Sequence, residues 1–186
     1  YFSCQRCDVY GVDLGEVILD TAKTAHGLRV RQLVTRSDDA QLNATGMWAR
    51  DSNNTITTQL TGKITSPDVG AMLKQFDVSS GIKDSGADID FDLAWPNSPF
   101  DFSLVDVNGD IAWSLSDGYL TELSDKGSRI LTLFSLNSLV RKLSLDFRDV
   151  FAKGFFYDDM SGTVQIADGR AFTQDTEIDG GAGEIE

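Results

Sequence analysis

The sequence predicts a mainly β protein with short α-helices, built as a curved antiparallel β-sheet or half-barrel groove whose helices lie near the C-terminal end. Three observations favour this fold class. Apolar and polar residues alternate over several segments, glycines punctuate these segments, and three short stretches have helical spacing. The 186 residues are 41% hydrophobic and 24% charged, which is typical of a folded soluble protein that forms one domain or one piece of a longer repetitive domain.

The most regular alternation lies between residues 87 and 115. Successive side chains of a strand point to opposite faces, so the apolar residues of this region are expected on one face and its Asp and Ser residues on the other. Antiparallel sheets with one solvated face have this pattern. The residues expected on the apolar face are Ile89, Phe91, Leu93, Trp95, Phe100, Phe102, Leu104, Ile111, Trp113 and Leu115.

Other segments alternate less regularly, and we expect strands in them as well. They comprise residues 3–9, 14–21, 28–35, 41–50, 55–65, 155–157, 162–167 and 170–178. A short unit, apolar-x-Gly-x-apolar, recurs around Gly62, Gly109 and Gly162, with a looser copy around Gly46. Glycines inside strands mark bends or bulges, so we expect such irregularities there. Residues 51–54, Asp-Ser-Asn-Asn, predict a turn.

Three short helices are expected. The first covers residues 67–76, with Ser66 as N-cap, Pro67 at the first helical position, and apolar residues at helical spacing up to Phe76. The other two come from a leucine-rich block that cannot form one amphipathic helix, because its apolar residues surround the helical wheel. Divided at Ser135, the block predicts helices at residues 126–134 and 136–142, a helical insertion of about 125–143.

The apolar face has two possible roles. The helices could close over it and form an ordinary core, or part of it could stay uncovered as a groove for acyl chains. Large uncovered apolar patches on soluble proteins usually mark ligand or partner sites. The sequence leaves both possibilities open.

The charge of the chain excludes one class of function. A formal net charge of −13 and a pI near 4.3 argue against nucleic-acid binding, which depends on clustered Lys and Arg. One block between residues 129 and 153 is basic, with five basic residues against two acidic ones. It could contact anionic lipid headgroups or pair with the acidic sheet. Its basic residues are Arg129, Arg141, Lys142, Arg148 and Lys153.

Cys4 and Cys7 allow several interpretations. In a regular strand they would face opposite sides about 10 Å apart, too far for a disulfide, so a bond requires a turn or bulge. Two unpaired thiols are the main alternative. A redox site lacks the expected helix start, and a zinc site lacks ligands, because His26 is the only histidine of the chain.

Nothing in the sequence favours an enzyme or a cofactor. Acidic pairs such as Asp146 with Asp149 are abundant, but most acids alternate with apolar residues and are expected on the solvated face, which argues against a glycan hydrolase or lectin. Phosphate-binding loops, nucleophile elbows and calcium loops are absent from the sequence. The apolar run at residues 130–140 is too short to span a bilayer, and both ends look like cuts in a longer chain.

The region from Gly118 onward resembles the C-terminal region of the YhdP-type AsmA-like family. The resemblance is carried by Gly127-x-Arg129-x-Leu131, Ser135-Leu136, Leu145-Asp146-Phe147-x-Asp149-Val150-Phe151-x-Lys153-Gly154-Phe155 and Asp168-Gly169. Weaker parts of it are Gly46-x-Trp48, Leu60-x-Gly62, Asp68-x-Gly70-x-x-Leu73 and Leu93-x-Trp95.

This resemblance implies a periplasmic protein of Gram-negative bacteria, anchored in the inner membrane, whose β-groove carries phospholipids toward the outer membrane. It implies no catalytic residues and no cofactor. Phospholipid acyl chains would be the ligand, and an outer-membrane or periplasmic protein could bind the helical segment. The alternative from another class is a structural or docking module of the cell envelope with a fully buried core.

Overall fold

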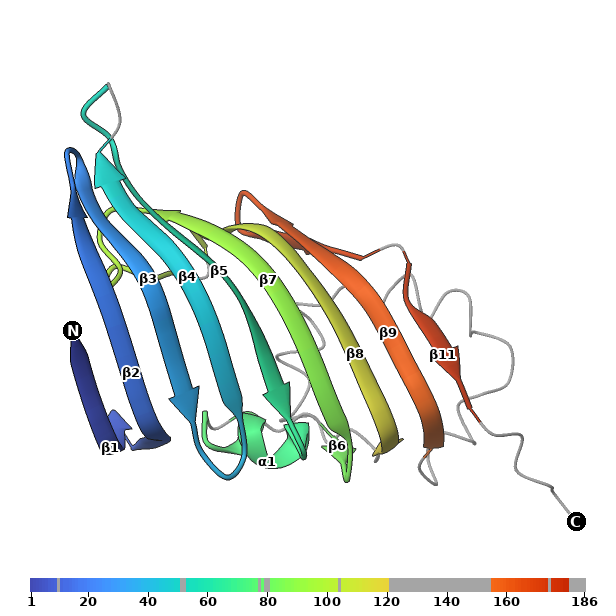
Figure 1. Cartoon of the computed structure of the whole chain (residues 1–186). Helices are drawn as coiled ribbons and strands as arrows, with labels where there is room; N and C mark the ends of the chain where they lie inside the picture. The colour runs from blue at the N-terminus through green and yellow to red at the C-terminus, as the bar shows by residue number, and fades with distance from the viewer. Residues whose placement is uncertain are drawn as a thin grey trace, which may run out of the picture.

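The computed structural model describes residues 1–9, 11–50, 53–76, 78, 81–103, 105–120, 155–173 and 175–180. Within these residues the chain forms one large antiparallel sheet and one short helix (Figure 1). The elements are β1 (Phe2–Val9), β2 (Val12–Thr24), β3 (Gly27–Arg36), β4 (Gln41–Arg50), β5 (Ile56–Ser66), α1 (Val69–Lys74), β6 (Ile82–Lys83), β7 (Gly86–Pro96), β8 (Asn108–Leu120), β9 (Phe155–Ala167), β10 (Arg170–Phe172) and β11 (Glu177–Asp179). The mainly β, curved antiparallel fold expected from the alternation is confirmed.

The sheet is a meander in which neighbours in the chain are neighbours in space. Its order is β1-β2-β3-β4-β5-β7-β8-β9-β10, with β6 paired to the end of β8 and β11 paired to β9. All pairs are antiparallel. Because side chains alternate along each strand and the strands pair side by side, the alternation along the sequence converts directly into two faces of one sheet.

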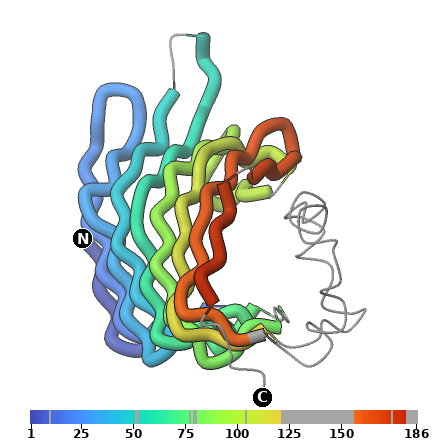
Figure 2. Tube along the Cα trace, turned by 90° about the vertical axis from the view of Figure 1, so that its right-hand side faces the viewer, coloured from blue at the N-terminus to red at the C-terminus, as the bar shows by residue number. Residues whose placement is uncertain are grey.

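The strands bend toward the side on which α1 lies, as the two views at right angles show (Figures 1 and 2). Irregular register accompanies the bend near the N-terminal edge. β2 is shifted against β3 between Asp20 and Thr21, and β3 is shifted against β4 between Val30 and Leu33. Extra residues of this kind raise the local twist and curve a strand.

The glycines of the repeated unit do not mark bulges. The pairing of β4 with β5 runs without a shift through Gly46 and Gly62, and the pairings of β8 continue regularly through Gly109 and opposite Gly162. The expectation of irregular register at these glycines is therefore wrong. Gly15 does lie at a register shift, with φ +61.

The turn between β9 and β10 follows from its sequence. Asp168 and Gly169 have φ values of 51° and 69°, and Ala167 pairs with Arg170 directly across the turn. Two consecutive residues at positive φ define the type I′ turn of two-residue hairpins, for which Asp-Gly is a preferred pair. β9 itself is one continuous strand, because its whole length pairs with β8, where the sequence indicated two shorter ones.

Helix α1 lies where the sequence placed it but begins and ends differently. Its N-cap is Asp68, whose carboxylate accepts a hydrogen bond from the Ala71 backbone N–H at 3.1 Å. Ser66 instead ends β5, where its hydroxyl donates to the Asp39 carbonyl oxygen at 2.6 Å. The helix stops at Lys74, which leaves Phe76 57% exposed instead of on the buried side.

The segment after β7 is a loop, although Phe100 to Leu104 alternate as a strand would. β7 ends at Pro96, the next residue Asn97 has φ +67°, and Pro99 lacks the N–H that a ladder needs. Asp101 then fixes a turn by accepting hydrogen bonds from the Ser98 N–H at 3.1 Å and the Ser98 hydroxyl at 2.8 Å. Local turn chemistry therefore overrides the alternation of this segment.

The core forms where α1 packs on the sheet. Buried residues of the helix, Val69 and Met72, meet Ala87, Leu115 and Tyr157 of three strands. Partly buried residues surround this cluster: Ala40, Ile64, Leu73, Ile82, Ile89, Trp113, Leu120, Met160 and Ile178. The helices expected at residues 126–134 and 136–142, and the helical insertion as a whole, lie outside the described residues.

Candidate functional site

The candidate face is the apolar side of the sheet, and cross-strand pairs define it. Phe91 pairs with Ile111, and Ile89 pairs with Trp113. Because directly paired residues of antiparallel strands point to the same side, these residues share one face. Leu93, Trp95 and Leu115 lie on it as well, through their spacing along β7 and β8. Seven of the ten residues expected there are thus placed together: Ile89, Phe91, Leu93, Trp95, Ile111, Trp113 and Leu115.

The other three residues are not part of this strand face. Phe100 lies in the loop and is 96% exposed, whereas Phe102 is half-buried because its ring packs edge-on against Trp95, with centroids 5.3 Å apart. Leu104 lies outside the described residues. Phe102 therefore continues the apolar surface from the loop, and Phe100 does not.

The register reveals a continuous line of apolar side chains and small residues that crosses the strands. It takes one residue from each of eight strands, and each residue pairs directly with the next: Phe2, Leu19, Leu33, Ala44, Gly62, Phe91, Ile111 and Val164. We call this line the apolar row. With neighbouring strands about 4.8 Å apart, its seven steps extend over about 34 Å. One leaflet of a bilayer, half of a hydrocarbon core of about 30 Å, is shorter than this row.

The N-terminal half of the row was missed by sequence reasoning. The register shifts in β1, β2 and β3 interrupt the period of two, so Phe2, Leu19 and Leu33 do not continue one alternating pattern. One sequence signal could have extended the predicted face toward the N-terminus. It is the pair of small residues Ala44 and Gly62, which lie opposite each other on β4 and β5, the two strands between the halves of the row.

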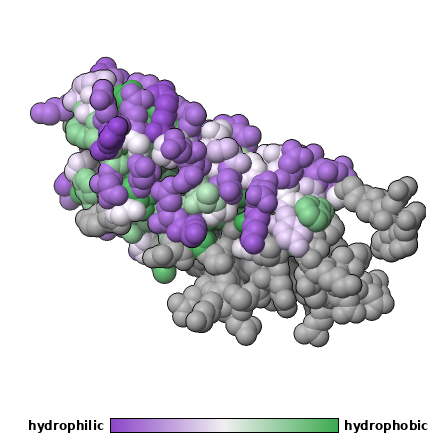
Figure 3. Space-filling model, turned by 90° about the horizontal axis from the view of Figure 1, so that it is seen from below, coloured by the Kyte–Doolittle hydropathy of each residue, from purple (hydrophilic) through white to green (hydrophobic). Residues whose placement is uncertain are grey.

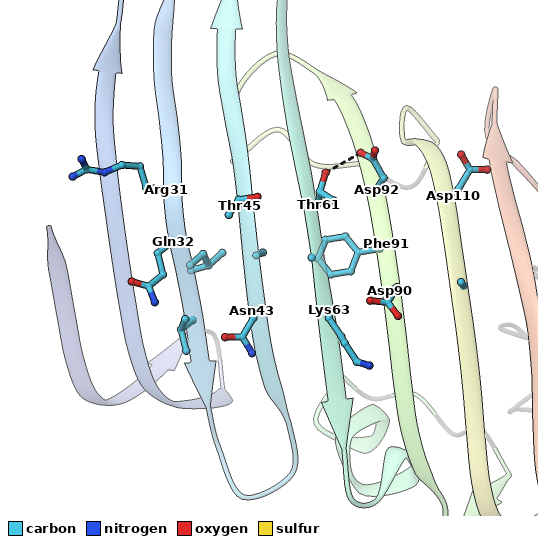
Figure 4. Close-up of a pocket in the computed structure, with 15 residues that line it drawn as sticks. Arg31, Gln32, Asn43, Thr45, Thr61, Lys63, Asp90, Phe91, Asp92 and Asp110 are labelled. Carbon is cyan, nitrogen blue, oxygen red and sulfur yellow. Dashed lines mark hydrogen bonds between the residues drawn. The ribbon is translucent and has the colours of Figure 1, made fainter.

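The glycines of the repeated unit lie on the same face, each directly beside a large apolar residue. Gly62 pairs with Phe91, Gly162 with Trp113, and Gly46 with Leu60. A Cβ on Gly162 would lie 3.2 Å from Trp113 Cζ2, and one on Gly62 would lie 2.7 Å from the Ala44 Cβ. Figure 4 shows the Phe91 ring directed from β7 toward β5, where Gly62 leaves room. The unit thus provides space for large side chains on a crowded face.

The two ends of the apolar face are covered differently from its middle. At one end α1 packs over Ala87 and Leu115, and at the other the loop after β7 brings Phe102 against Trp95. Along the middle, Phe91 is 9% exposed and Val164 is 2% exposed, while Ile111 is half-buried. Exposure therefore varies from residue to residue along the apolar row.

The opposite face of the sheet is polar. A hollow of about 680 Å³ lies beside its polar side chains, among them Asn43, Lys63 and Asp90 (Figure 4). The residues that line it come from β3, β4, β5, β7 and β8, and they also include four residues of the apolar row: Leu33, Ala44, Gly62 and Phe91. A view from below shows hydrophilic residues over much of the described surface (Figure 3). The hollow thus lies on the same strands as the central part of the apolar row.

Exposed ion pairs cross this polar face. Lys63 Nζ lies 2.7 Å from Asp88 Oδ1, and the hydrogen bond to Asp88 raises the pKa of Lys63. Arg31 Nη2 lies 2.8 Å from Asp20 Oδ1, and the hydrogen bond from Arg31 lowers the pKa of Asp20. Pairs this exposed contribute little to stability, so they mainly keep this face hydrated and its strands in register.

A buried polar cluster ties α1 to the sheet. Ser85 is fully buried, and its Oγ accepts a hydrogen bond from the Tyr157 hydroxyl at 2.9 Å and donates to the Ser116 carbonyl at 3.1 Å. The Ser85 carbonyl accepts from the first helical N–H, of Val69, at 2.8 Å. Burial raises the pKa of Tyr157, so its phenol stays protonated and can donate. The ring lies against Gly118, its partner across the strands.

Cys4 and Cys7 form a disulfide with their Cα atoms 5.9 Å apart. Cys4 pairs with Val17 and Cys7 with Gly15, so three steps along β1 correspond to two along β2. The additional residue is a bulge, which brings two side chains that would otherwise face opposite sides to one side. The structure therefore meets the geometric condition for this bond, and the interpretation as two unpaired thiols is wrong.

The remaining candidates concern metal binding, membrane spans and the basic block. The part of the chain that the structure describes contains no group of three or more His, Cys, Asp or Glu arranged to hold a metal ion. No helix among the described residues is long and apolar enough to cross a membrane. The basic candidates Arg129, Arg141, Lys142, Arg148 and Lys153 lie outside the described residues.

Comparison with known proteins identifies the family. The model of the YhdP protein family matches residues 1–186. The chain is 32% identical over 178 residues to the intermembrane phospholipid transporter YhdP of Escherichia coli strain K12, a match that covers 95% of this chain and 14% of that relative. The chain thus spans about 14% of the length of the curated relative that it matches. No solved structure matches the chain. The family match over the whole chain and the identity to this relative show that the chain belongs to the YhdP family.

Proposed function

We propose that the apolar face of this sheet forms part of a path along which phospholipids move between the inner and outer membranes, and that this movement contributes to the lipid homeostasis of the outer membrane. The apolar row is the observation that carries the proposal, because it crosses eight strands from one edge of the sheet toward the other. The relative's name, intermembrane phospholipid transporter, supports phospholipid as the ligand class.

Transfer along such a face requires that the acyl chains are shielded from water, and no covalent bond is made or broken. Acyl chains lie against the apolar row, roughly across the strands, while the headgroup stays in water. Each buried CH₂ contributes about 0.8 kcal/mol, so a long chain gains enough to leave a bilayer only if most of it contacts apolar surface. A row longer than a leaflet meets this condition, and the protein acts without catalytic residues or a cofactor.

The proposed location is the periplasm, with the full-length protein anchored in the inner membrane. A Cys4–Cys7 disulfide supports an oxidising compartment, since structural disulfides persist in the bacterial periplasm and are rare in the cytosol. The same compartment lies between the two membranes of Gram-negative bacteria. The relative comes from such an organism.

The basic block is proposed to contact anionic headgroups or a protein partner. Five basic residues against two acidic ones stand out in a chain with a net charge of −13. Each basic residue close to an anionic membrane surface contributes about 1 kcal/mol of attraction. An outer-membrane or periplasmic protein that binds this segment would place the end of the lipid path beside its acceptor.

A structural or docking module with a closed core is the second candidate function. The burial of Phe91, Leu115 and Val164 favours it, because these residues are at most 9% exposed. In that case the apolar face only stabilises the fold, and no lipid contacts it.

Lipid analysis of the purified protein distinguishes the two candidates. Mild purification followed by organic extraction and mass spectrometry is expected to recover phospholipid in amounts comparable with the protein, because removal of bound acyl chains would expose the apolar row. The control is an unrelated acidic periplasmic protein prepared in the same way. Phospholipid no more abundant than in that control would contradict the transport proposal.

A further inference from the structure

Trp113 places a polar atom within the apolar face. It lies on β8 between Ile89 and Gly162, its partners on the two neighbouring strands. The indole packs against the core cluster near α1, and the missing side chain of Gly162 leaves room for its six-membered ring. A phenylalanine would provide apolar surface at this position without a hydrogen-bond donor, so the indole N–H is the feature that needs an explanation.

The indole nitrogen of Trp113 is buried and has no hydrogen-bond partner among the residues that the structure describes. A buried N–H without an acceptor costs about 1 to 3 kcal/mol. Trp95, on the same face, differs in this respect, because its Nε1 donates to the Ser98 carbonyl at 3.1 Å. The Trp95 N–H is therefore bonded within the protein, whereas the Trp113 N–H has no acceptor among the described residues and could donate to an acceptor on a ligand.

The surroundings of Trp113 restrict what that acceptor can be. Its cross-strand neighbours are an isoleucine and a glycine, and the cluster that it joins is apolar apart from the Tyr157 hydroxyl, which donates to Ser85. The Thr176 side chain also lies beside Gly162, and its hydroxyl is hydrogen-bonded to the Thr173 hydroxyl at 3.1 Å. Water and charged headgroups are poorly accommodated in such a place. A phospholipid carries its ester carbonyls between the headgroup and the acyl chains. These carbonyl oxygens are acceptors without charge that enter an apolar site together with the chains.

We propose that Trp113 Nε1 donates a hydrogen bond to an ester carbonyl of the bound phospholipid and thereby fixes the depth at which the acyl chains lie on the apolar face. This inference rests on the proposed transport function and adds a specificity residue to it. Two flexible side chains, Met72 and Met160, belong to the same packed group. Methionine changes rotamer easily, so the end of the face near α1 can adjust when a lipid enters.

Competition between ester-linked and ether-linked phospholipid tests the inference. The purified protein is incubated with vesicles that contain equal amounts of dioleoyl phosphatidylethanolamine and its diether analogue, which has no carbonyl, and the bound lipids are quantified by mass spectrometry. The wild-type protein is expected to bind the diester about threefold to tenfold more than the diether, which is the contribution of one hydrogen bond.

Two conservative variants locate the effect. Trp113→Phe retains the apolar ring and loses the donor, so its ratio of diester to diether is expected to fall to about one. Trp95→Phe removes a donor that is already bonded to Ser98, and its ratio is expected to stay at the wild-type value.

Three results would overturn the inference. The first is a ratio of diester to diether near one in the wild-type protein, which can be observed without any variant. The second is an unchanged preference for the diester in a folded Trp113→Phe variant. The third is a loss of that preference in Trp95→Phe equal to the loss in Trp113→Phe. A wild-type protein that binds both lipids equally would refute the role of Trp113 while the transport proposal stands. A wild-type protein that binds neither lipid would contradict the transport proposal itself.

Discussion

Replacing Gly118 with alanine is expected to destabilise the protein by about 3 kcal/mol, because the new methyl group has no space. Its Cβ would lie 2.1 Å from the Tyr157 hydroxyl oxygen and 2.8 Å from the Ser85 Cβ. Tyr157 would have to move, and its buried hydrogen bond to Ser85 would break. The free energy of unfolding in urea measures this effect.

Gly86→Ala is the matched control for this change. It lies on the neighbouring strand, where the closest atom to an added Cβ would be the Ser116 hydroxyl oxygen at 3.0 Å, the end of a small side chain that can rotate, and the Ser66 carbonyl oxygen would lie at an ordinary contact distance of 3.7 Å. We expect this variant to stay within about 1 kcal/mol of the wild type. If the two alanine variants had the same urea midpoint of unfolding, the contact between Tyr157 and Gly118 would not hold the sheet to α1.

Ile111→Asp is expected to abolish lipid binding, because it places a carboxylate in the middle of the apolar row, between Phe91 and Val164. Ile111 is half-buried, so the carboxylate can keep contact with water when no lipid is bound. The variant should therefore remain folded, whereas a charge in a closed core would unfold a domain that has only about 5 to 15 kcal/mol of stability. A thermal melt and the co-purified phospholipid are measured together.

Ala112→Asp provides the control one residue away. Ala112 is exposed on the polar face, and the new carboxylate would lie opposite Asp90. Repulsion across the strands costs less than about 1 kcal/mol, so this variant should fold and retain its lipid. If Ile111→Asp unfolds while Ala112→Asp does not, the closed-core module is favoured. If Ile111→Asp stays folded and keeps its lipid, the path lies on another surface.

Much of the sheet could be predicted because alternation and antiparallel pairing give the same answer. β4 has the predicted bounds, Gln41–Arg50. The paired faces of β7 and β8 follow from the same period of two. In these segments the burial of one face and the local propensity of each strand agree, which is the condition under which a sequence can be read residue by residue.

The errors arose where short-range geometry decides the structure. Ser66 and Asp68 are both good N-caps, and the choice between them depends on the bond from Ser66 to the distant Asp39 carbonyl. The loop after β7 alternates like a strand, but Pro99 and the Asp101 turn prevent pairing. The bulge at Cys4 and Cys7 changes which residues of β1 point to each face of the sheet. Such features depend on contacts that a periodic pattern does not contain.

The candidate site was predictable in its centre and not at its edges. Phe91, Ile111 and Trp113 follow from the alternation, whereas Phe2 and Leu19 join the apolar row only through shifted register. The role of the glycines was also misjudged, because a missing side chain can make room for a neighbour as well as bend a strand.

A photo-crosslinking scan along β8 tests the central claim most directly. A photoreactive amino acid is introduced in cells at each position from Asp110 to Ser114, and phospholipid attached to the protein is detected after irradiation. Crosslinks are expected at Ile111 and Trp113, on the apolar face, and none are expected at positions 110, 112 and 114, on the polar face. Crosslinks at the polar positions, or at no position in folded protein, would contradict the claim that this face is the lipid path.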